Sequence, residues 1–358
     1  MFTWKRMGVD RLLPKNSSGN KISVIIPVRN EEENILKLLQ DLLNQDLSPK
    51  HFEVLIINDN STDNTEKLVK EFIANYSLQH FTLLNLELEG VQNSYKKKAI
   101  EFGISRASGN IIVGTDGDCR VGKFWLTTIY EHMQDTEIVL LSSPVCLEED
   151  RSVFTQLQSM EFAGLIGSGA ASIQLGFPYT CNGANIAYRK DAFEKLKGFE
   201  GVDHLASGDD EFLLHKVVKQ YPGKVKFLKN KEAIVTTKAM PTLKAFLSQR
   251  KRWSGKWKSY KLARVKVLAV FFFLFHFFLF YACILSLAGK YSVELFIAQI
   301  LLKLAVEYGF LRSVHQFFDK KMKVLIFFFL QFLYPVYISF FGLVANFGGY
   351  EWKGRKVN

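Results

Sequence analysis

The feature that most constrains this chain is an apolar run from Val265 to Gly289, VKVLAVFFFLFHFFLFYACILSLAG, in which Lys266 is the only charged residue. About 20 consecutive apolar residues suffice for a helix to cross the hydrocarbon core of a bilayer, so the run predicts a transmembrane helix. A buried helix of a soluble protein is the alternative interpretation. The composition, with 48% hydrophobic and 23% charged residues, excludes a disordered chain, a collagen and a coiled coil.

Two more apolar stretches follow the first. Residues Val293 to Leu311 include Lys303 and Glu307, which lie four positions apart and can pair on one face of a span packed against its neighbours. Residues Val324 to Phe347 include Pro335, which predicts either a kink or a division into a re-entrant pair of helices. We therefore expect a membrane region at residues 256–350 with two or three hydrophobic spans.

Basic residues adjoin these stretches and predict their orientation. The segment just before the first span has no acid, and its Lys and Arg residues are Arg250, Lys251, Arg252, Lys256, Lys258, Lys261, Arg264 and Lys266. Such a segment marks the cytoplasmic side, so we expect an integral membrane protein with a cytoplasmic catalytic domain. A purely electrostatic membrane anchor is the alternative for this segment. Nucleic acid is not an expected partner, because the basic residues adjoin a span instead of lining a soluble face.

Other segments bear on topology and compartment. Lys320, Lys321 and Lys323 lie inside if the first two stretches form a hairpin. The tail, residues 351–358, is also basic, so we expect the third stretch to be re-entrant or interfacial. Residues 1–20 lack the apolar core of a signal peptide, and none is expected. The four scattered cysteines form no CxxC pair, which indicates reduced thiols.

Residues 20 to 250 alternate between strand and helix patterns. Apolar runs predict strands at residues 22–27, 53–57, 81–86 and 110–114, and helical spacing predicts helices at residues 31–47, 65–76 and 94–105. Continuous apolar strands that alternate with helices indicate a parallel sheet covered on both faces. Ligands of such sheets bind beyond the carboxyl ends of the strands. The loops after Ile57 and Gly114, both rich in Asp, are therefore the candidate site.

The segment Thr115-Asp116-Gly117-Asp118-Cys119 carries the chemistry we consider most informative. The glycine allows a turn that brings both carboxylates onto one divalent cation. Mg²⁺ and Mn²⁺ take oxygen ligands and are often shared with substrate phosphates. A solvated turn is the alternative, because a lone DxD is common by chance. The chain has no GxxxxGK[ST] and no GxGxxG after a strand, which removes the support for a P-loop or a dinucleotide site.

Six segments, in order, resemble the family 2 glycosyltransferases, which have the GT-A fold. They are residues 25–32 (IIPVRNEE), 57–63 (INDNSTD), 98–104 (KAIEFGI), 115–118 (TDGD), 207–211 (SGDDE) and 249–253 (QRKRW). In membrane-attached members a span directly follows the last element, as it does here. The resemblance implies a Rossmann-like, nucleotide-diphospho-sugar transferase domain at residues 21–255, between an N-terminal segment at 1–20 and the membrane region.

The resemblance also implies roles at the donor end. Pro27, Arg29 and Glu31 would form the first loop against the nucleotide, and Asp59 would accept the N–H of uracil. Asp116 and Asp118 would flank the diphosphate, with Asp118 the preferred ligand of Mg²⁺ or Mn²⁺. The metal would stabilise charge on the departing nucleoside diphosphate. Lys98, in the run Lys96 to Lys98, would approach the phosphates; a solvated helix face is the alternative.

At the acceptor end, Asp210 is the candidate general base. The family usually has Glu one position earlier and this chain has Asp209, so either acid is a candidate. Gln249, Arg252 and Trp253 would contact the diphosphate and the acceptor, and residues 154–172 form a candidate interfacial helix. The hypothesis is inverting transfer of a sugar from a UDP-sugar to a membrane-associated, lipid-linked acceptor. The alternatives are a processive polysaccharide synthase, a ceramide-glucosyltransferase-like enzyme and a non-catalytic nucleotide-binding membrane protein.

Overall fold

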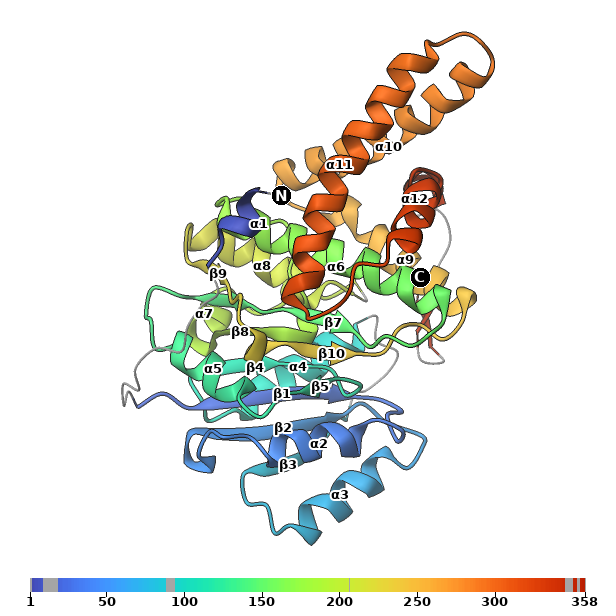
Figure 1. Cartoon of the computed structure of the whole chain (residues 1–358). Helices are drawn as coiled ribbons and strands as arrows, with labels where there is room; N and C mark the ends of the chain where they lie inside the picture. The colour runs from blue at the N-terminus through green and yellow to red at the C-terminus, as the bar shows by residue number, and fades with distance from the viewer. Residues whose placement is uncertain are drawn as a thin grey trace.

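A seven-stranded sheet forms the centre of the structure, a computed structural model that describes residues 2–8, 19–87, 94–205, 207–344, 350–352 and 355–357 (Figure 1). Residues 9–18 of the expected N-terminal segment and residues 353, 354 and 358 of the expected basic tail lie outside the described residues. The strand order is β3-β2-β1-β4-β8-β6-β9. The strands are β1 (Ile22–Val28), β2 (Phe52–Asn58), β3 (Phe81–Asn85), β4 (Ile111–Gly114), β6 (Leu140–Ser142), β8 (Ile186–Arg189) and β9 (Val225–Phe227).

The topology of this sheet confirms the expected α/β class and locates its binding crevice. Strands β3, β2, β1 and β4 are parallel to one another, whereas β8 runs antiparallel to both β4 and β6. The chain passes outward from β1 to β2 and β3 and then returns to β4 on the other side of β1. Ligands of open α/β sheets bind where the strand order reverses, at the carboxyl ends of the strands. That point lies between β1 and β4.

Helices connect the strands where the hydrophobic spacing predicts them. The helix expected from residue 31 begins at Ile35, where buried residues recur at Leu38, Leu39 and Leu42. The helices around the sheet are α2 (Ile35–Leu43), α3 (Thr65–Asn75), α4 (Tyr95–Arg106), α5 (Trp125–His132), α7 (Lys190–Lys195) and α8 (Asp209–Gln220). The strand predictions in residues 20–115 are confirmed, because buried parallel strands have continuous apolar runs that stand out in the sequence.

Smaller elements complete the domain. A three-stranded sheet has the order β5-β10-β7, and a two-stranded sheet joins β11 to β12. The elements are α1 (Phe2–Arg6), β5 (Arg120–Val121), β7 (Val145–Leu147), β10 (Val235–Thr237), β11 (Tyr350–Trp352) and β12 (Arg355–Val357). Short 3₁₀ helices are η1 (Pro49–His51), η2 (Gly183–Asn185), η3 (Lys231–Ala233) and η4 (Gly255–Ser259).

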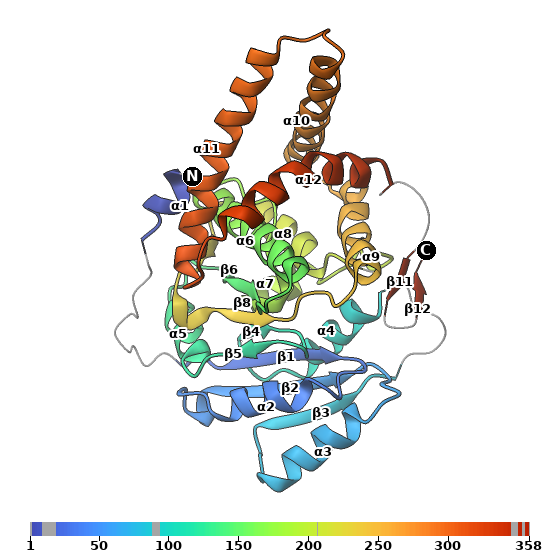
Figure 2. The same ribbon diagram turned by 45° about the vertical axis from the view of Figure 1, so that its right-hand side comes forward.

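Long helices gather at one end of the domain. They are α6 (Val153–Gln174), α9 (Leu243–Ser254), α10 (Ala263–Leu287), α11 (Val293–Phe317) and α12 (Val324–Val344). Helices α10 and α11 form a hairpin that projects from the domain, and α12 runs across its base near α6 and α9 (Figure 2). Pro335 lies inside α12 without ending it, so the structure has one continuous helix here instead of a re-entrant pair.

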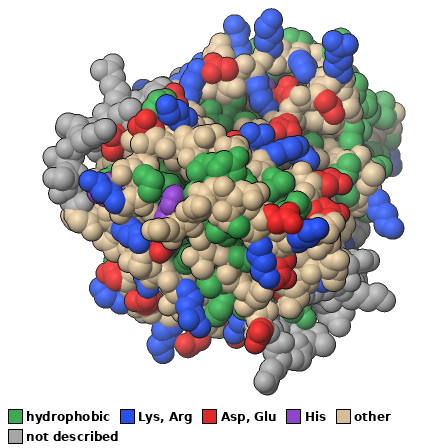
Figure 3. All heavy atoms as spheres, turned by 90° about the horizontal axis from the view of Figure 1, so that it is seen from below, with side chains coloured by type: hydrophobic (Ala, Val, Ile, Leu, Met, Phe, Trp, Pro, Cys, Tyr) green, Lys and Arg blue, Asp and Glu red, His purple; other side chains and the backbone are tan. Residues whose placement is uncertain are grey.

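Two of these helices have the length and composition of membrane spans. Among the described residues these are Ala263–Leu287 and Val324–Leu343. Large apolar side chains remain exposed on α10, α11 and α12, for example Phe278 (58%), Leu302 (69%) and Phe332 (78%). The face at the α2 and α3 end, by contrast, carries interspersed basic and acidic side chains (Figure 3). An extended apolar surface of this kind suits a hydrocarbon environment better than water.

Candidate active site

A cavity of about 760 Å³ begins at the carboxyl ends of the central strands and extends to the long helices. Its polar end lies at the crossover between β1 and β4 and is lined by Pro27, Arg29, Glu31, Asp59, Asp116 and Asp118. Its other end lies among α6, α10 and α12 and is lined by apolar residues that include Leu165, Val265, Leu268, Phe272, Ile338 and Phe341. Polar loops and apolar helices therefore line one continuous cavity.

The two loops expected to bind the nucleotide contact each other closely. The Arg29 guanidinium donates hydrogen bonds to the backbone carbonyls of Asp59 and Asn60, at 2.8 and 2.7 Å. A Cβ atom added to Gly117 would lie 3.0 Å from a Val28 methyl group and 3.1 Å from Cγ of Glu31, so a glycine permits this approach. The predicted residues of the first loop, the Asp59 loop and the DxD turn therefore meet at one end of the cavity.

Of the lysines in the run Lys96 to Lys98, Lys96 lines the cavity and Lys98 does not. The Lys96 ammonium lies 2.6 Å from Oδ1 of Asp116 and 3.5 Å from Oδ2 of Asp209. Lys98 is absent from the cavity lining and lies 3.9 Å from Glu101, with 39% of its side chain exposed. Residues two apart on an α-helix point about 200° from each other, so only one of them can face the cavity.

Electrostatics keep Lys96 charged. Burial is the largest influence and by itself lowers its pKa, but Asp116 and then Asp209 more than offset burial, so the pKa lies above its ordinary value. The ammonium therefore bridges a carboxylate of the DxD turn and a carboxylate at the start of α8. This arrangement places a fixed positive charge beside the expected position of the diphosphate.

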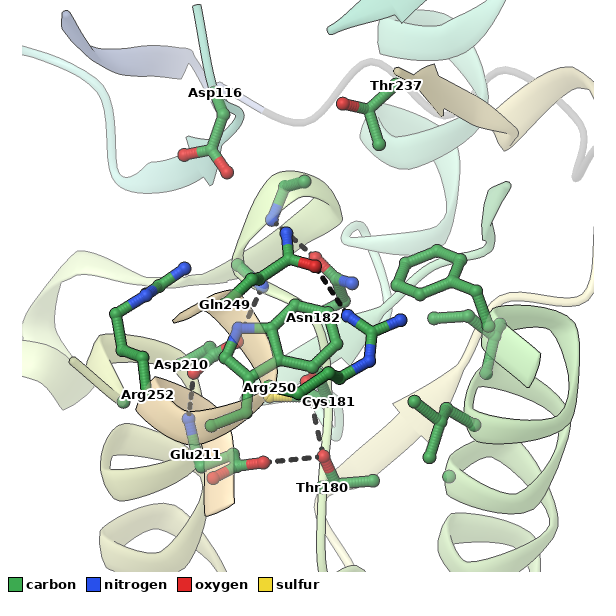
Figure 4. Close-up of a pocket in the computed structure, with 18 of the residues that line it drawn as sticks. Asp116, Thr180, Cys181, Asn182, Asp210, Glu211, Thr237, Gln249, Arg250 and Arg252 are labelled. Carbon is green, nitrogen blue, oxygen red and sulfur yellow. Dashed lines mark hydrogen bonds between the residues drawn. The ribbon is translucent and has the colours of Figure 1, made fainter. Parts of the chain in front are cut away.

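Three acids form the first turn of α8, and Figure 4 shows two of them, Asp210 and Glu211, in the wall of the cavity. The residue before them, Gly208, has φ +83°, and a Cβ atom there would lie 2.8 Å from the Phe212 ring and 2.9 Å from Cδ of Lys256. Glycine adopts this left-handed conformation without steric cost. The helix N-terminus that follows favours negative charge, so the turn suits the acids Asp209, Asp210 and Glu211.

The partners of these acids differ. Asp210 accepts hydrogen bonds from the backbone N–H of Gly183 at 2.9 Å and from that of Glu211 at 2.7 Å. Glu211 is held by three side chains, the hydroxyls of Thr180 and Tyr260 and the ammonium of Lys256. Glu211 thus has side-chain partners on both oxygens, whereas the hydrogen bonds that Asp210 accepts from the described residues come from backbone N–H groups.

The two candidate bases, Asp209 and Asp210, differ in pKa. Burial is the largest influence on Asp210; together with repulsion from Asp209 and Glu211 it outweighs the attraction of Lys256 and raises the pKa to about 6. Burial also raises the pKa of Asp209, but Lys96 and further cationic and hydrogen-bonding partners outweigh it, so that pKa lies below its ordinary value. A pair of carboxylates with separated pKa values is typical of general-base sites.

The segment 249–253 (QRKRW), at the end of α9, contributes side chains to the wall of the cavity. Gln249, Arg252 and Trp253 all line the cavity. Figure 4 shows Arg252 on the left and Arg250 on the right, with Gln249 between them. Arg250, which had no expected role beyond the basic segment, pairs with Glu161 of α6, and both side chains are almost fully buried.

Sequence reasoning missed Glu161 and Lys256, and it named Lys96 only as part of the run Lys96 to Lys98. Glu161 is the single acid in the apolar stretch 154–172, and that isolation is a signal that could have found it. Lys256 was counted only as part of the basic segment, and no pattern links it to Glu211. These three side chains provide charge compensation for the predicted acids and for the α9 motif.

The carboxylates at the polar end of the cavity are candidate ligands of a divalent cation. Among the residues that the structure describes, no cluster of three or more His, Cys, Asp or Glu side chains is arranged to hold a metal. Asp116 and Asp118 offer two carboxylates at the same end of the cavity. Mg²⁺ commonly binds through one or two carboxylates together with substrate phosphates. The residues therefore fit a cation that the nucleotide helps to hold.

Comparison with known proteins agrees with this geometry. Residues 111–340 match the model of Glycosyl transferase family group 2, and residues 23–197 match that of Glycosyl transferase family 2. Glycosyltransferase AglE of Haloferax volcanii is 28% identical over 53% of this chain and 58% of its own length. The undecaprenyl-phosphate 4-deoxy-4-formamido-L-arabinose transferase of Proteus mirabilis is 33% identical over 28% of this chain and 29% of its own length.

A solved structure extends the likeness to most of the fold. The mannosyltransferase PcManGT of Pyrobaculum calidifontis, in complex with GDP-Man and Mn²⁺, aligns with a TM-score of 0.59. The alignment covers 96% of this chain and 92% of that one at 17% identity, which shows a shared fold. One of the family models spans well over half of the chain, including the DxD turn, the acids of α8 and the α9 motif. The chain belongs to the family 2 glycosyltransferases, enzymes with the GT-A fold.

Proposed function

We propose that this protein transfers a sugar, with inversion, from a UDP-sugar to a lipid-linked acceptor at the cytoplasmic face of a membrane. The observation that carries the proposal is the single cavity that begins among carboxylates at the β1–β4 crossover and ends among the apolar helices. A soluble, charged donor and an amphipathic acceptor need opposite environments that meet at one reacting centre. The cavity offers both.

The donor end is suited to a nucleoside diphosphate. Asp59 can accept an N–H of the base, and Lys96 provides the positive charge that a diphosphate needs. A bound Mg²⁺ or Mn²⁺, held by Asp116 and Asp118, would neutralise charge on the departing nucleoside diphosphate. The related mannosyltransferase structure with GDP-Man and Mn²⁺ supports a nucleotide sugar and a divalent cation at this end of the fold.

Asp210 is the general base in this proposal. Its carboxylate takes the proton of the acceptor hydroxyl as that oxygen attacks the anomeric carbon from the side opposite the leaving group. Inversion follows from this single displacement. With a pKa of about 6, Asp210 is ionised at neutral pH and still basic enough to accept the proton. Asp209, paired with Lys96, orients the ammonium instead.

The acceptor end is suited to a lipid. Apolar residues of α6, α10 and α12 line it, and α10 and α12 expose apolar side chains on their outer surfaces. The relative named as an undecaprenyl-phosphate transferase supports a polyprenyl-linked acceptor. The short membrane region favours single transfer over extrusion of a polymer. The basic segment before α10 supports a cytoplasmic position for this face.

Nucleotide release by the full chain, purified in detergent, tests the proposal. Panels of UDP- and GDP-sugars are supplied with Mg²⁺ or Mn²⁺ and a membrane-lipid extract. We expect turnover with a UDP-sugar that depends on lipid, that is lost in Asp118→Ala and Asp210→Asn, and that is retained in Asp191→Asn, an exposed acid paired with Lys195. Loss of UDP binding in Asp118→Ala but not in Asp210→Asn would separate donor binding from catalysis. Lipid-independent turnover, or none with any donor, would refute the proposal.

A further inference from the structure

The buried ion pair at the acceptor end contains an arginine whose nitrogens are all engaged within the protein. Nε of Arg250 donates to both carboxylate oxygens of Glu161 at 3.1 Å, Nη2 donates to Glu161 at 2.5 Å, and Nη1 donates to the side-chain oxygen of Gln249. Arg250 is 5% and Glu161 8% exposed. An arginine with these partners has little capacity left to bind a substrate, although it lines the cavity.

The same guanidinium also packs on two aromatic rings of α9. Its centre lies 4.3 Å from the Trp253 ring centroid and 4.5 Å from that of Phe246. A cation held at this distance from an indole attracts the ring and restricts its orientation. Arg250 therefore contacts both ends of the motif, Gln249 through a hydrogen bond and Trp253 through its ring.

The ion pair extends to the helix that crosses the base of the hairpin. The Tyr337 hydroxyl of α12 donates a hydrogen bond to Oε1 of Glu161 at 2.9 Å. Tyr337 stacks on Tyr334, and one turn earlier Gln331 accepts a hydrogen bond from Lys303 of α11. These polar side chains recur every three residues along α12, so they share one face of an otherwise apolar helix. That face points to the cavity and to α11.

We propose that Glu161, Arg250 and Tyr337 form a positioning unit that fixes Gln249 and Trp253 and makes use of the acceptor depend on the placement of α12. This inference rests on the proposed function. Because the unit lies at the acceptor end, it sets the affinity for the lipid acceptor without contributing to nucleotide binding. The three residues are positioning residues, not catalytic ones.

The physical argument predicts different effects for two kinds of variant. Tyr337→Phe removes one hydrogen bond to a charged group and keeps the ring, so we expect the half-saturating lipid concentration to rise about tenfold. The double variant Glu161→Gln with Arg250→Met replaces both buried charges, and such replacements are often neutral for stability. If positioning is the role, the double variant folds normally and still uses the acceptor poorly. If the pair only stabilises the fold, any effect of the double variant appears in the melting temperature and the lipid dependence stays unaltered.

The experiment titrates a polar lipid extract against nucleotide release by the full chain in detergent, and measures the dissociation constant of UDP and the melting temperature. Tyr308→Phe, which alters a tyrosine of α11 outside the cavity lining, is the matched control. We expect Tyr337→Phe and the double variant to raise the half-saturating lipid concentration, with UDP affinity, melting temperature and the control unchanged. Unaltered lipid dependence in both variants, or a parallel loss of UDP affinity, would overturn the inference alone. Absence of turnover in the unaltered protein would overturn the proposed function and this inference with it.

Discussion

The acid limb of the pH–rate profile distinguishes the two candidate bases. Burial raises the pKa of Asp210 to about 6, whereas the pKa of Asp209 lies below its ordinary value. If Asp210 is the base, kcat/KM falls as pH decreases through about 6, because protonation removes the base. For one group of this pKa, the ionised fraction drops about tenfold between pH 7 and pH 5. If Asp209 is the base, the profile is flat over that interval.

Substitutions make the assignment sharper. Asp210→Asn removes the base, and we expect kcat to fall by about 10² to 10⁴ with little change in UDP affinity. Lys256 lowers the pKa of Asp210, so Lys256→Met is expected to move the acid limb of the profile to higher pH.

The assay is initial-rate nucleotide release at saturating lipid from pH 5 to pH 8, with UDP affinity measured at each pH to separate binding from chemistry. A flat profile between pH 5 and pH 7 would refute the assignment of the base to Asp210. Full activity in Asp210→Asn together with loss in Asp209→Asn would do so independently.

Three further predictions concern the donor end and the turn before α8. Lys96→Met is expected to weaken UDP binding about tenfold or more by calorimetry, while Lys98→Met leaves it unchanged; equal effects would contradict the assignment of Lys96. Gly208→Ala should lower the free energy of unfolding by about 1–2 kcal/mol because of its left-handed backbone, and by a further amount because of the clash with Phe212. Gly223, with φ +79° and open space around it, is the control, because Gly223→Ala carries the backbone cost alone. Similar melting temperatures for both alanine variants would refute the clash. Chelation of divalent cations should abolish nucleotide release, and Mn²⁺ or Mg²⁺ should restore it, with Asp118→Ala requiring a higher metal concentration; activity in the chelator would contradict the metal site.

The parts of the fold that follow from local patterns could be predicted from the sequence. Strand β1 is a largely apolar run with six of its seven residues buried, so its sequence pattern predicts a buried strand. The DxD turn and the acids of α8 each lie within one short segment, and the resemblance to family 2 covers them. The rule that strand ends converge at a crossover brings the DxD turn beside the first loop and the Asp59 loop, whereas it does not fix the position of the acids of α8.

Other features depend on information that a local pattern does not contain. The run Lys96 to Lys98 does not reveal which lysine faces the cavity. The answer depends on how α4 is rotated about its axis, and tertiary packing fixes that rotation. The partners Glu161 and Arg250 lie 89 positions apart, so only the folded chain brings them together. The continuous helix through Pro335 reflects packing of α12 against α10, α6 and α9, which outweighs the missing backbone hydrogen bond.

Residues on both sides of the domain boundary expected at residue 255 contribute to the site. Lys256 and Tyr260 follow that boundary, and both hold Glu211 in the first turn of α8. Further along, apolar residues of α10 and α12 line the same cavity as the carboxylates of the central sheet. Folding of the helical region is therefore coupled to the geometry of the acidic turn. An enzyme that joins a charged donor to a lipid gains from this coupling, because the walls that contact the two substrates are held in one fixed arrangement.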